Sequence, residues 1–254
     1  MADRISQPRC VRPVIPLQSP QPPRGRERGE LPRCRRRARE GASIVTVSTQ
    51  TGETVPQPTT DDAGLPLDSL YRLTVEQYHA LAREGILTDD DPVELLEGLL
   101  VCKMTKYRPH TMATGLLRDA LAEIVALEYY VDAQEPVTTS DSEPEPDLLV
   151  VRGTRRDYRD RQPGPDEVVM VVEVADTTLR RDRGVKKRIY AAARLPIYWI
   201  VNLKQRQIEV YADPTGPAQR PTYAQRHDYR PEETIPVVID NAEVGRILVK
   251  DVLP

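Results

Sequence analysis

A nearly continuous run of apolar residues constrains the fold of this chain more than any other feature. The segment Glu167-Val-Val-Met-Val-Val-Glu-Val174 lacks the alternation of polar and apolar residues that a half-buried strand shows. Such a run is typical of a strand that is covered on both faces. We therefore expect a central sheet with other elements packed against each of its two sides.

The other periodic segments predict helices and strands that fit such a sheet. Thr74 and Gln77 match a capping box, which predicts a short helix from Val75 that ends at Gly85. Apolar residues recur at intervals of three and four across 110–127, and a further helix is expected at 182–193, ended by Leu195-Pro196. Strands are expected at 93–104 with a turn at Glu97-Gly98, and at 129–135, 147–152, 167–174, 197–202 and 207–211, with short strands from 221 onward. The order of these elements predicts an α/β fold with a mixed central sheet flanked by helices and with additional β-hairpins.

The composition changes abruptly near residue 45. The first forty residues hold 11 of the 36 basic residues, all of them arginine, together with frequent prolines and almost no apolar periodicity. Such a segment buries too little apolar surface to offset the entropy of ordering it. We therefore expect residues 1–68 to form a disordered arm and linker, and residues 69–254 to form one folded domain. The change in composition also suggests that translation starts near Val45, with an organelle transit peptide as the weaker alternative.

Charge and cysteine content narrow the classes of protein that fit. Without the first forty residues, the chain carries 25 basic and 35 acidic residues, a formal charge near −10. This balance disfavours a broadly basic nucleic-acid-binding surface but leaves room for a local basic groove. No apolar run approaches the ~20 residues that cross a bilayer, and Cys10, Cys34 and Cys102 form no CxxC pair. We expect a cytoplasmic protein without disulfides or a zinc site.

Two carboxylates stand at the ends of neighbouring predicted strands. Glu173 closes the apolar run, and Asp147 opens the preceding strand after Glu143-Pro-Glu-Pro146. Carboxylates at adjacent strand ends can converge on one divalent ion, and Mg²⁺ prefers such oxygen ligands. The alternative is that Glu173 is simply a solvated residue where a strand leaves the core.

A lysine on the following helix is predicted to point toward these acids. At 100° per residue, with Val185 at 0°, Lys186 lies at 100° and Tyr190 at 140°, inside the apolar face. Lys187 at 200° and Arg188 at 300° point away from it. A lysine that faces the core needs an anionic partner, unless its side chain extends so that the ammonium group reaches solvent. The sequence leaves both arrangements open.

Weaker candidates complete the set. His110 begins the long helix and could accept a proton or bind a ligand, although a surface histidine is equally consistent with its position. Glu97 lies in a turn, where an exposed acid needs no further explanation. His79 and His227 lack partners at ligand spacing. No GxxxxGK[ST], GxGxxG, HExxH or GxSxG motif occurs, so the reactions associated with those motifs lack support.

The order of these residues resembles a known family. The blocks are Glu145-Pro-Asp147-Leu-Leu-Val-Val, Val-Val-Glu173-Val-Ala-Asp-Thr-Thr, Arg-Asp182-Arg-Gly184-Val-Lys186 with Tyr190, and Leu-Pro196-Ile-Tyr198-Trp199-Ile-Val, preceded by Glu97-Gly98 and His110. Over about residues 70–254 the chain is similar to the Uma-two family of bacterial restriction-endonuclease-like proteins. The resemblance implies a PD-(D/E)XK nuclease core.

Carried over by this resemblance, Asp147 and Glu173 would bind Mg²⁺ or Mn²⁺, assisted by the carbonyl of Val174. The motif's usual lysine would fall two residues after Glu173, where this chain has Ala175. Lys186 is the natural replacement, although Val185 stands where an acid would be expected before it. His110 and Glu97 would be auxiliary catalytic residues.

The function that the resemblance implies is that of a metal-dependent endonuclease that hydrolyses phosphodiester bonds of nucleic acid. DNA is the expected substrate, and a homodimer would suit duplex cleavage. Two alternatives remain open from the sequence: a nuclease fold without turnover that serves as a binding or regulatory module, and a small-molecule phosphodiesterase.

Overall fold

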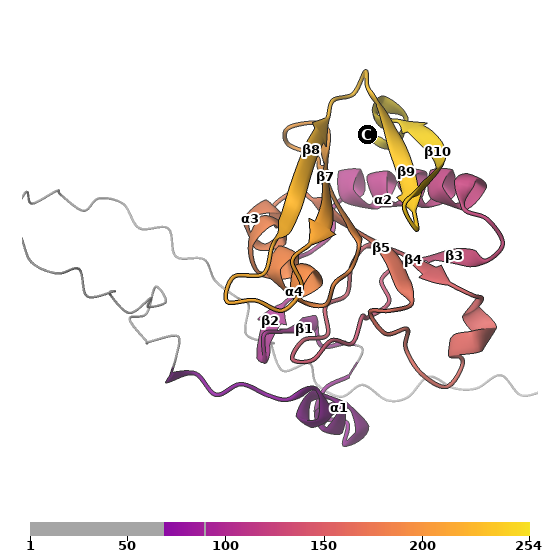
Figure 1. Ribbon diagram of the computed structural model, residues 1–254. Coiled ribbons are helices and arrows are strands. Elements are labelled where there is room, and N and C mark those ends of the chain that lie inside the picture. Colours follow the sequence, from indigo (N-terminus) through magenta and orange to yellow (C-terminus); the bar gives the residue numbers. More distant parts are fainter. Residues whose placement is uncertain (1–68, 89) are drawn as a thin grey trace, which may run out of the picture. The chain divides into compact units, whose positions relative to one another are not determined.

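The computed structural model describes residues 69–88 and 90–254, which form an α/β fold around a six-stranded sheet (Figure 1). The arm and linker predicted for 1–68 lie outside the described residues. The strand order is β3-β4-β5-β6-β7-β8. Only β5 and β6 run parallel, so the sheet is mixed, as predicted. The strands are β3 (Tyr129–Asp132), β4 (Leu148–Arg152), β5 (Val168–Ala175), β6 (Ile197–Asn202), β7 (Gln207–Pro214) and β8 (Tyr223–Tyr229).

Helices and two hairpins surround the sheet. The hairpins are β1 (Val93–Leu96) with β2 (Leu99–Cys102), and β9 (Thr234–Ile239) with β10 (Ala242–Leu248). The helical elements are α1 (Val75–Arg83), α2 (Arg108–Ile124), η2 (Arg155–Tyr158), α3 (Leu179–Arg181), η3 (Asp182–Lys186), α4 (Lys187–Ala192) and η4 (Val249–Val252). Within the described part of the chain, no helix is both long and apolar enough to cross a membrane.

Strand β5 is the centre of the core, and all eight of its residues are buried. Val172 and Val174 belong to a cluster with Leu117 of α2 and the β9–β10 hairpin, whereas Val171 and Ala175 belong to a second cluster with residues of α4. The alternate side chains of one strand therefore meet different layers. This two-sided burial explains the uninterrupted apolar run, because each fully buried aliphatic side chain contributes about 1.5–3 kcal/mol.

The segment predicted as one helix over 182–193 is covered by two consecutive elements, η3 and α4, and a third element, α3, precedes them. α3 leads into the π-helical turn η3, which leads into α4, and α4 ends at Ala192, before the predicted limit. Arg194 adopts φ +59°, so the chain has already left the helical conformation before Pro196. A π-turn changes the angle between successive side chains, and such turns often occur at functional sites. As a result Asp182 and Lys186 are buried while Val185, which the helical wheel placed on the apolar face, is only half-buried.

The turn predicted at Glu97-Gly98 joins β1 to β2. Both residues have positive φ, 47° and 77° respectively, as a two-residue hairpin turn of the primed type requires. A Cβ atom on Gly98 would lie 2.6 Å from Cβ of Arg72, so glycine is needed for space as well as for conformation. The turn fixes the register of the hairpin, which carries Glu94 on β1.

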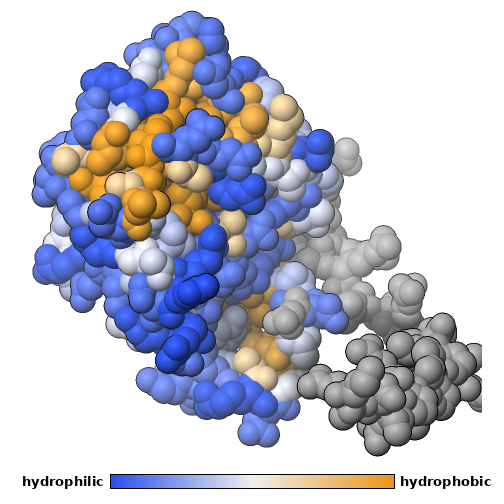
Figure 2. All heavy atoms as spheres, turned by 90° about the vertical axis from the view of Figure 1, so that its right-hand side faces the viewer, coloured by the Kyte–Doolittle hydropathy of each residue, from blue (hydrophilic) through white to orange (hydrophobic). Residues whose placement is uncertain are grey.

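The two ends of the long helix α2 lie at different parts of the surface. It begins at Arg108 rather than His110 because Pro109 suits the first turn of a helix, and it ends at Ile124, short of the predicted limit. Figure 2 shows an apolar patch on the face that carries the C-terminal end of α2 and the β9–β10 hairpin, where Leu127 and Val244 are exposed. His110 lies at the opposite end of the helix, where the candidate site is built.

Candidate active site

The two predicted acids meet at the end of the sheet. In the antiparallel ladder Leu148 pairs with Val172, so Asp147, one residue before β4, lies opposite Glu173 of β5. The side chains are 5% and 6% exposed. Burying two ionised carboxylates without partners would be very costly, so the groups that compensate them define the chemistry of the site.

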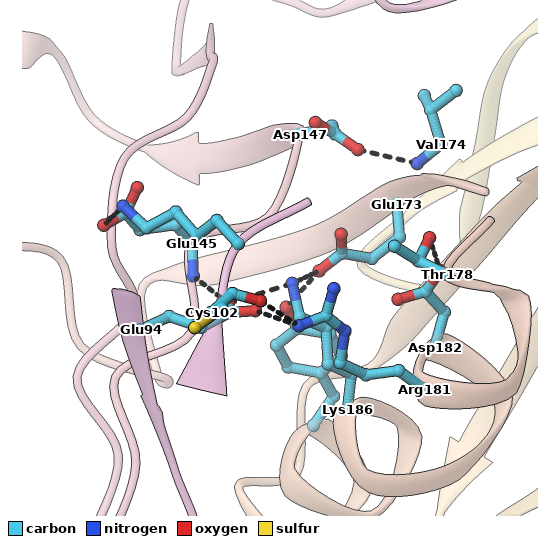
Figure 3. A network of polar contacts seen from close by, with 12 residues as sticks. Glu94, Cys102, Glu145, Asp147, Glu173, Val174, Thr178, Arg181, Asp182 and Lys186 are labelled. Atoms are coloured by element: carbon cyan, nitrogen blue, oxygen red, sulfur yellow. Dashed lines mark hydrogen bonds and ion pairs between the residues drawn. The ribbon is translucent and has the colours of Figure 1, made fainter. Parts of the chain in front are cut away.

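Lys186 is the main compensating cation. Its Nζ lies 2.8 Å from Oε1 of Glu173 and 3.1 Å from Oε2 of Glu94, and Tyr190 Oη donates a hydrogen bond of 2.6 Å to the same Glu173 oxygen (Figure 3). Burial raises the pKa of Glu173 to about 8, although Lys186 acts to lower it. The neighbouring acids keep the pKa of Lys186 above its usual value despite its burial. The lysine predicted to face inward therefore does so, and it meets two carboxylates.

Asp147 has a different set of partners. Its Oδ2 accepts a hydrogen bond of 2.8 Å from the backbone amide of Val174 and lies 3.1 Å from Nε2 of His110. Its Oδ1 lies 3.0 Å from Nζ of Lys106. Burial acts to raise the pKa of Asp147, but His110, Lys106 and the Val174 amide outweigh it and lower the pKa below its usual value. Asp147 is thus held ionised beside Glu173, whose pKa moves the opposite way.

Asp182 and Glu94 also belong to the site, and the sequence reading did not single them out as site residues. Asp182 accepts a hydrogen bond of 2.6 Å from Thr178, and burial raises its pKa to about 6 although Lys186 acts to lower it. Glu94 is 2% exposed and reaches Lys186 from the β1–β2 hairpin. The signal for Asp182 was its place four residues before an inward lysine. For Glu94 it was an acid inside an apolar strand segment.

Glu97 does not join the group. Its carboxylate lies 2.8 Å from Nη2 of Arg188, and both residues line a second cavity with Arg72. By contrast, one cavity is lined by Asp147, Glu173, Lys186, His110 and Val174 together with Glu94 and Asp182. The position two residues after Glu173 is the buried Ala175, so no lysine on β5 enters the site.

The donor set suits a metal ion that retains much of its water. Among residues 69–88 and 90–254, no three His, Cys, Asp or Glu side chains converge closely enough to enclose a metal. However, one oxygen of Glu173 is free of hydrogen bonds to other described residues and points toward Asp147 (Figure 3). Two carboxylates with several waters are a usual environment for Mg²⁺, so the residues present fit a divalent ion held by two acids.

Comparisons with known proteins agree with this architecture. Residues 75–242 match the model of a family described as Uma2, putative restriction endonuclease, which confirms the resemblance seen in the sequence. A crystal structure of a putative nuclease belonging to DUF820 from Anabaena variabilis ATCC 29413 superposes with a TM-score of 0.53 at 14% identity, covering 71% of this chain and 97% of that one. This likeness supports the restriction-endonuclease-like fold. No protein with a curated description matches the chain.

Proposed function

Because the chain belongs to the Uma2 family of putative restriction endonucleases, we propose that it is an endonuclease that hydrolyses phosphodiester bonds of nucleic acid, most simply DNA, with a divalent metal ion. The observation that carries the proposal is that Asp147 and Glu173 lie opposite each other at the end of the sheet and line one cavity, with the buried Lys186 paired to Glu173. The different environments of the two acids support it further. Neighbouring titratable groups with pKa values shifted in opposite directions are common at catalytic sites.

Asp147 and Glu173 would hold Mg²⁺ or Mn²⁺, with the Val174 carbonyl as a further ligand. When bound, the ion would polarise the phosphate and acidify a water molecule. His110 and the Val174 amide fix the orientation of the Asp147 carboxylate. This part of the site is therefore organised before any ligand arrives.

Lys186 takes the role that the missing strand lysine would have. Its ammonium group has three donors, and Glu173 and Glu94 engage it at 2.8 and 3.1 Å. A fixed cation beside the reacting phosphate can orient a water molecule or stabilise the negative charge that develops during hydrolysis. Lys186 also holds one Glu173 oxygen, together with Tyr190, which leaves the other directed at Asp147.

The test is a cleavage assay on supercoiled plasmid, linear duplex, single-stranded DNA and RNA with Mg²⁺ or Mn²⁺. The wild-type chain is compared with Glu173→Ala and Lys186→Met. Glu167→Ala is the matched control, because Glu167 immediately precedes the opposite end of β5 and pairs with Arg161. We expect cleavage by the wild type and the control and a loss of at least about a hundredfold in the other two. Equal activity in Glu173→Ala and the wild type would discard the proposed centre.

A second candidate function is that of a nuclease fold that binds a partner without turnover. Ala175 favours it, because the strand lysine of the motif is missing. Metal titration combined with cleavage separates the two functions. A catalytic centre binds Mn²⁺, loses that binding in Asp147→Ala and cleaves nucleic acid, whereas a binding module shows no metal-dependent cleavage. A homodimer would place two centres on one duplex, and sedimentation in the presence of DNA tests that arrangement.

A further inference from the structure

Lys106 holds an unusual position beside the candidate active site. It belongs to the segment 103–107, which links β2 to α2 without helix or strand. Its Nζ lies 3.0 Å from Oδ1 of Asp147, and its side chain is 33% exposed whereas that of Asp147 is 5% exposed. A half-exposed lysine thus covers one oxygen of a buried carboxylate.

The two oxygens of Asp147 differ in how firmly they are held. The partners of Oδ2 are the amide of Val174 in the central strand and the ring of His110 in the long helix, and both are parts of the packed core. Among the residues that the structure describes, the partner of Oδ1 is one lysine side chain from an irregular segment. A divalent ion can therefore reach Oδ1 by displacing one ammonium group, without disturbing a helix or strand.

We propose that Lys106 is a displaceable counter-cation. In the absence of metal its ammonium group pairs with Oδ1 of Asp147, the oxygen that would bind the ion, and once the ion has entered it contacts a substrate phosphate. The inference rests on the proposed function, because it takes Asp147 as a metal ligand. The negative charge of Asp147 is neutralised by Lys106 in one state and by the ion in the other. The released ammonium remains at the mouth of the same cavity, which Lys106 lines, and a phosphate is the anion that would meet it there.

Removing the ammonium should have opposite effects on two ligands. Mn²⁺ should bind more tightly to Lys106→Met, since the ion no longer competes with an intramolecular cation. Nucleic acid should bind less tightly, since a phosphate contact is lost. A residue with a merely structural role would not change the two affinities in opposite directions.

Lys103 provides a matched control in the same segment. Its Nζ lies 2.5 Å from Oε1 of Glu145 and not against Asp147, with a side chain that is 31% exposed. Lys103→Met therefore removes the same charge at a similar exposure but leaves the Lys106 contact intact. Lys106→Arg keeps the charge and should behave like the wild type. Thermal melting checks that every variant is folded.

The experiment is a calorimetric titration of the full-length chain with Mn²⁺ alone, followed by anisotropy measurements with a labelled phosphorothioate DNA duplex in saturating Mn²⁺. We expect Lys106→Met to bind Mn²⁺ about fivefold more tightly, the scale of a half-exposed ion pair, and to bind DNA several-fold more weakly. Lys103→Met and Lys106→Arg should keep the Mn²⁺ affinity within about twofold.

Two results of the Mn²⁺ titration would overturn the inference while the proposed function stands: Mn²⁺ binding that is lost in Asp147→Asn but unchanged in Lys106→Met, or equal tightening in Lys103→Met, which would indicate a general effect of charge. Unchanged DNA affinity in Lys106→Met would show that Lys106 does not contact a substrate phosphate, and it would also overturn the proposal. If no variant and no wild-type protein bound Mn²⁺, the proposed function and the inference would both fail.

Discussion

Replacing Lys186 with methionine should destabilise the fold strongly and in a way that depends on pH. The side chain is 6% exposed and lies within 3.1 Å of two buried carboxylates, those of Glu173 and Glu94. Removing one partner of a buried ion pair costs about 3–5 kcal/mol, because the remaining charge stays buried without compensation. The free energy of unfolding of a typical domain is only about 5–15 kcal/mol, so the variant would lose a large share of its stability.

The pH dependence follows from the buried acids. Glu173 has a folded-state pKa of about 8 even with Lys186 present, and Lys186 acts to lower it. An acid whose pKa is raised in the folded state contributes stability below its unfolded pKa and loses that contribution as pH rises through the folded value. Without Lys186 the pKa of Glu173 rises further, so at pH 5.5 Glu173 stays protonated and adds no uncompensated charge to the core. The penalty for Lys186→Met should therefore be larger at pH 8.5 than at pH 5.5.

Urea unfolding followed by the fluorescence of the single tryptophan, Trp199, which is 1% exposed, measures this effect. With an m-value of about 2 kcal/mol/M, a loss of about 4 kcal/mol lowers the midpoint by about 2 M. Lys187→Met is the control, because Lys187 lies over the ring of Tyr211 and should cost under about 1 kcal/mol. A penalty for Lys186→Met below 1 kcal/mol, or an equal one at both pH values, would refute this reasoning.

Three further outcomes are expected. Glu173→Gln should gain thermal stability over the wild type in EDTA as pH rises from 5 to 8, because burial raises the pKa of Glu173 to about 8 and a glutamine never bears the cost of ionising in the core; a constant difference across that range would contradict this. Tyr190→Phe should lower the free energy of unfolding by about 1–2 kcal/mol, measured in urea, because it removes a buried hydrogen bond to a carboxylate; a neutral result would show that the bond contributes nothing. Gly98→Ala should cost about 2 kcal/mol or more by the same measurement, because φ is +77° and the new Cβ would meet Arg72; wild-type stability would show that the turn rearranges freely.

Local periodicity was sufficient to predict most of the fold. The apolar run of β5, the capping box at Thr74 and the turn at Glu97-Gly98 each involve neighbouring residues, and all three are present. The inward direction of Lys186 also followed from the spacing of apolar residues along the chain.

Other parts of the site depend on contacts between distant segments. Glu94 reaches Lys186 only because the β1–β2 hairpin and the helical segment that carries Lys186 come together in the fold, and no periodicity in the sequence encodes that contact. Asp182 is buried because of the π-turn, whereas the helical wheel assumed a regular α-helix and placed Val185, which is only half-buried, on the buried face. The position of Glu97 could not be inferred either, since it depends on Arg188.

The proposed function depends most on the binding of one divalent ion by Asp147 and Glu173 beside Lys186. Crystals of the protein soaked in Mn²⁺ and measured at the manganese absorption edge test it most directly. We expect an anomalous peak about 2.1 Å from a carboxylate oxygen of each acid. Density confined to other sites, at a Mn²⁺ concentration that saturates the protein in solution, would contradict it.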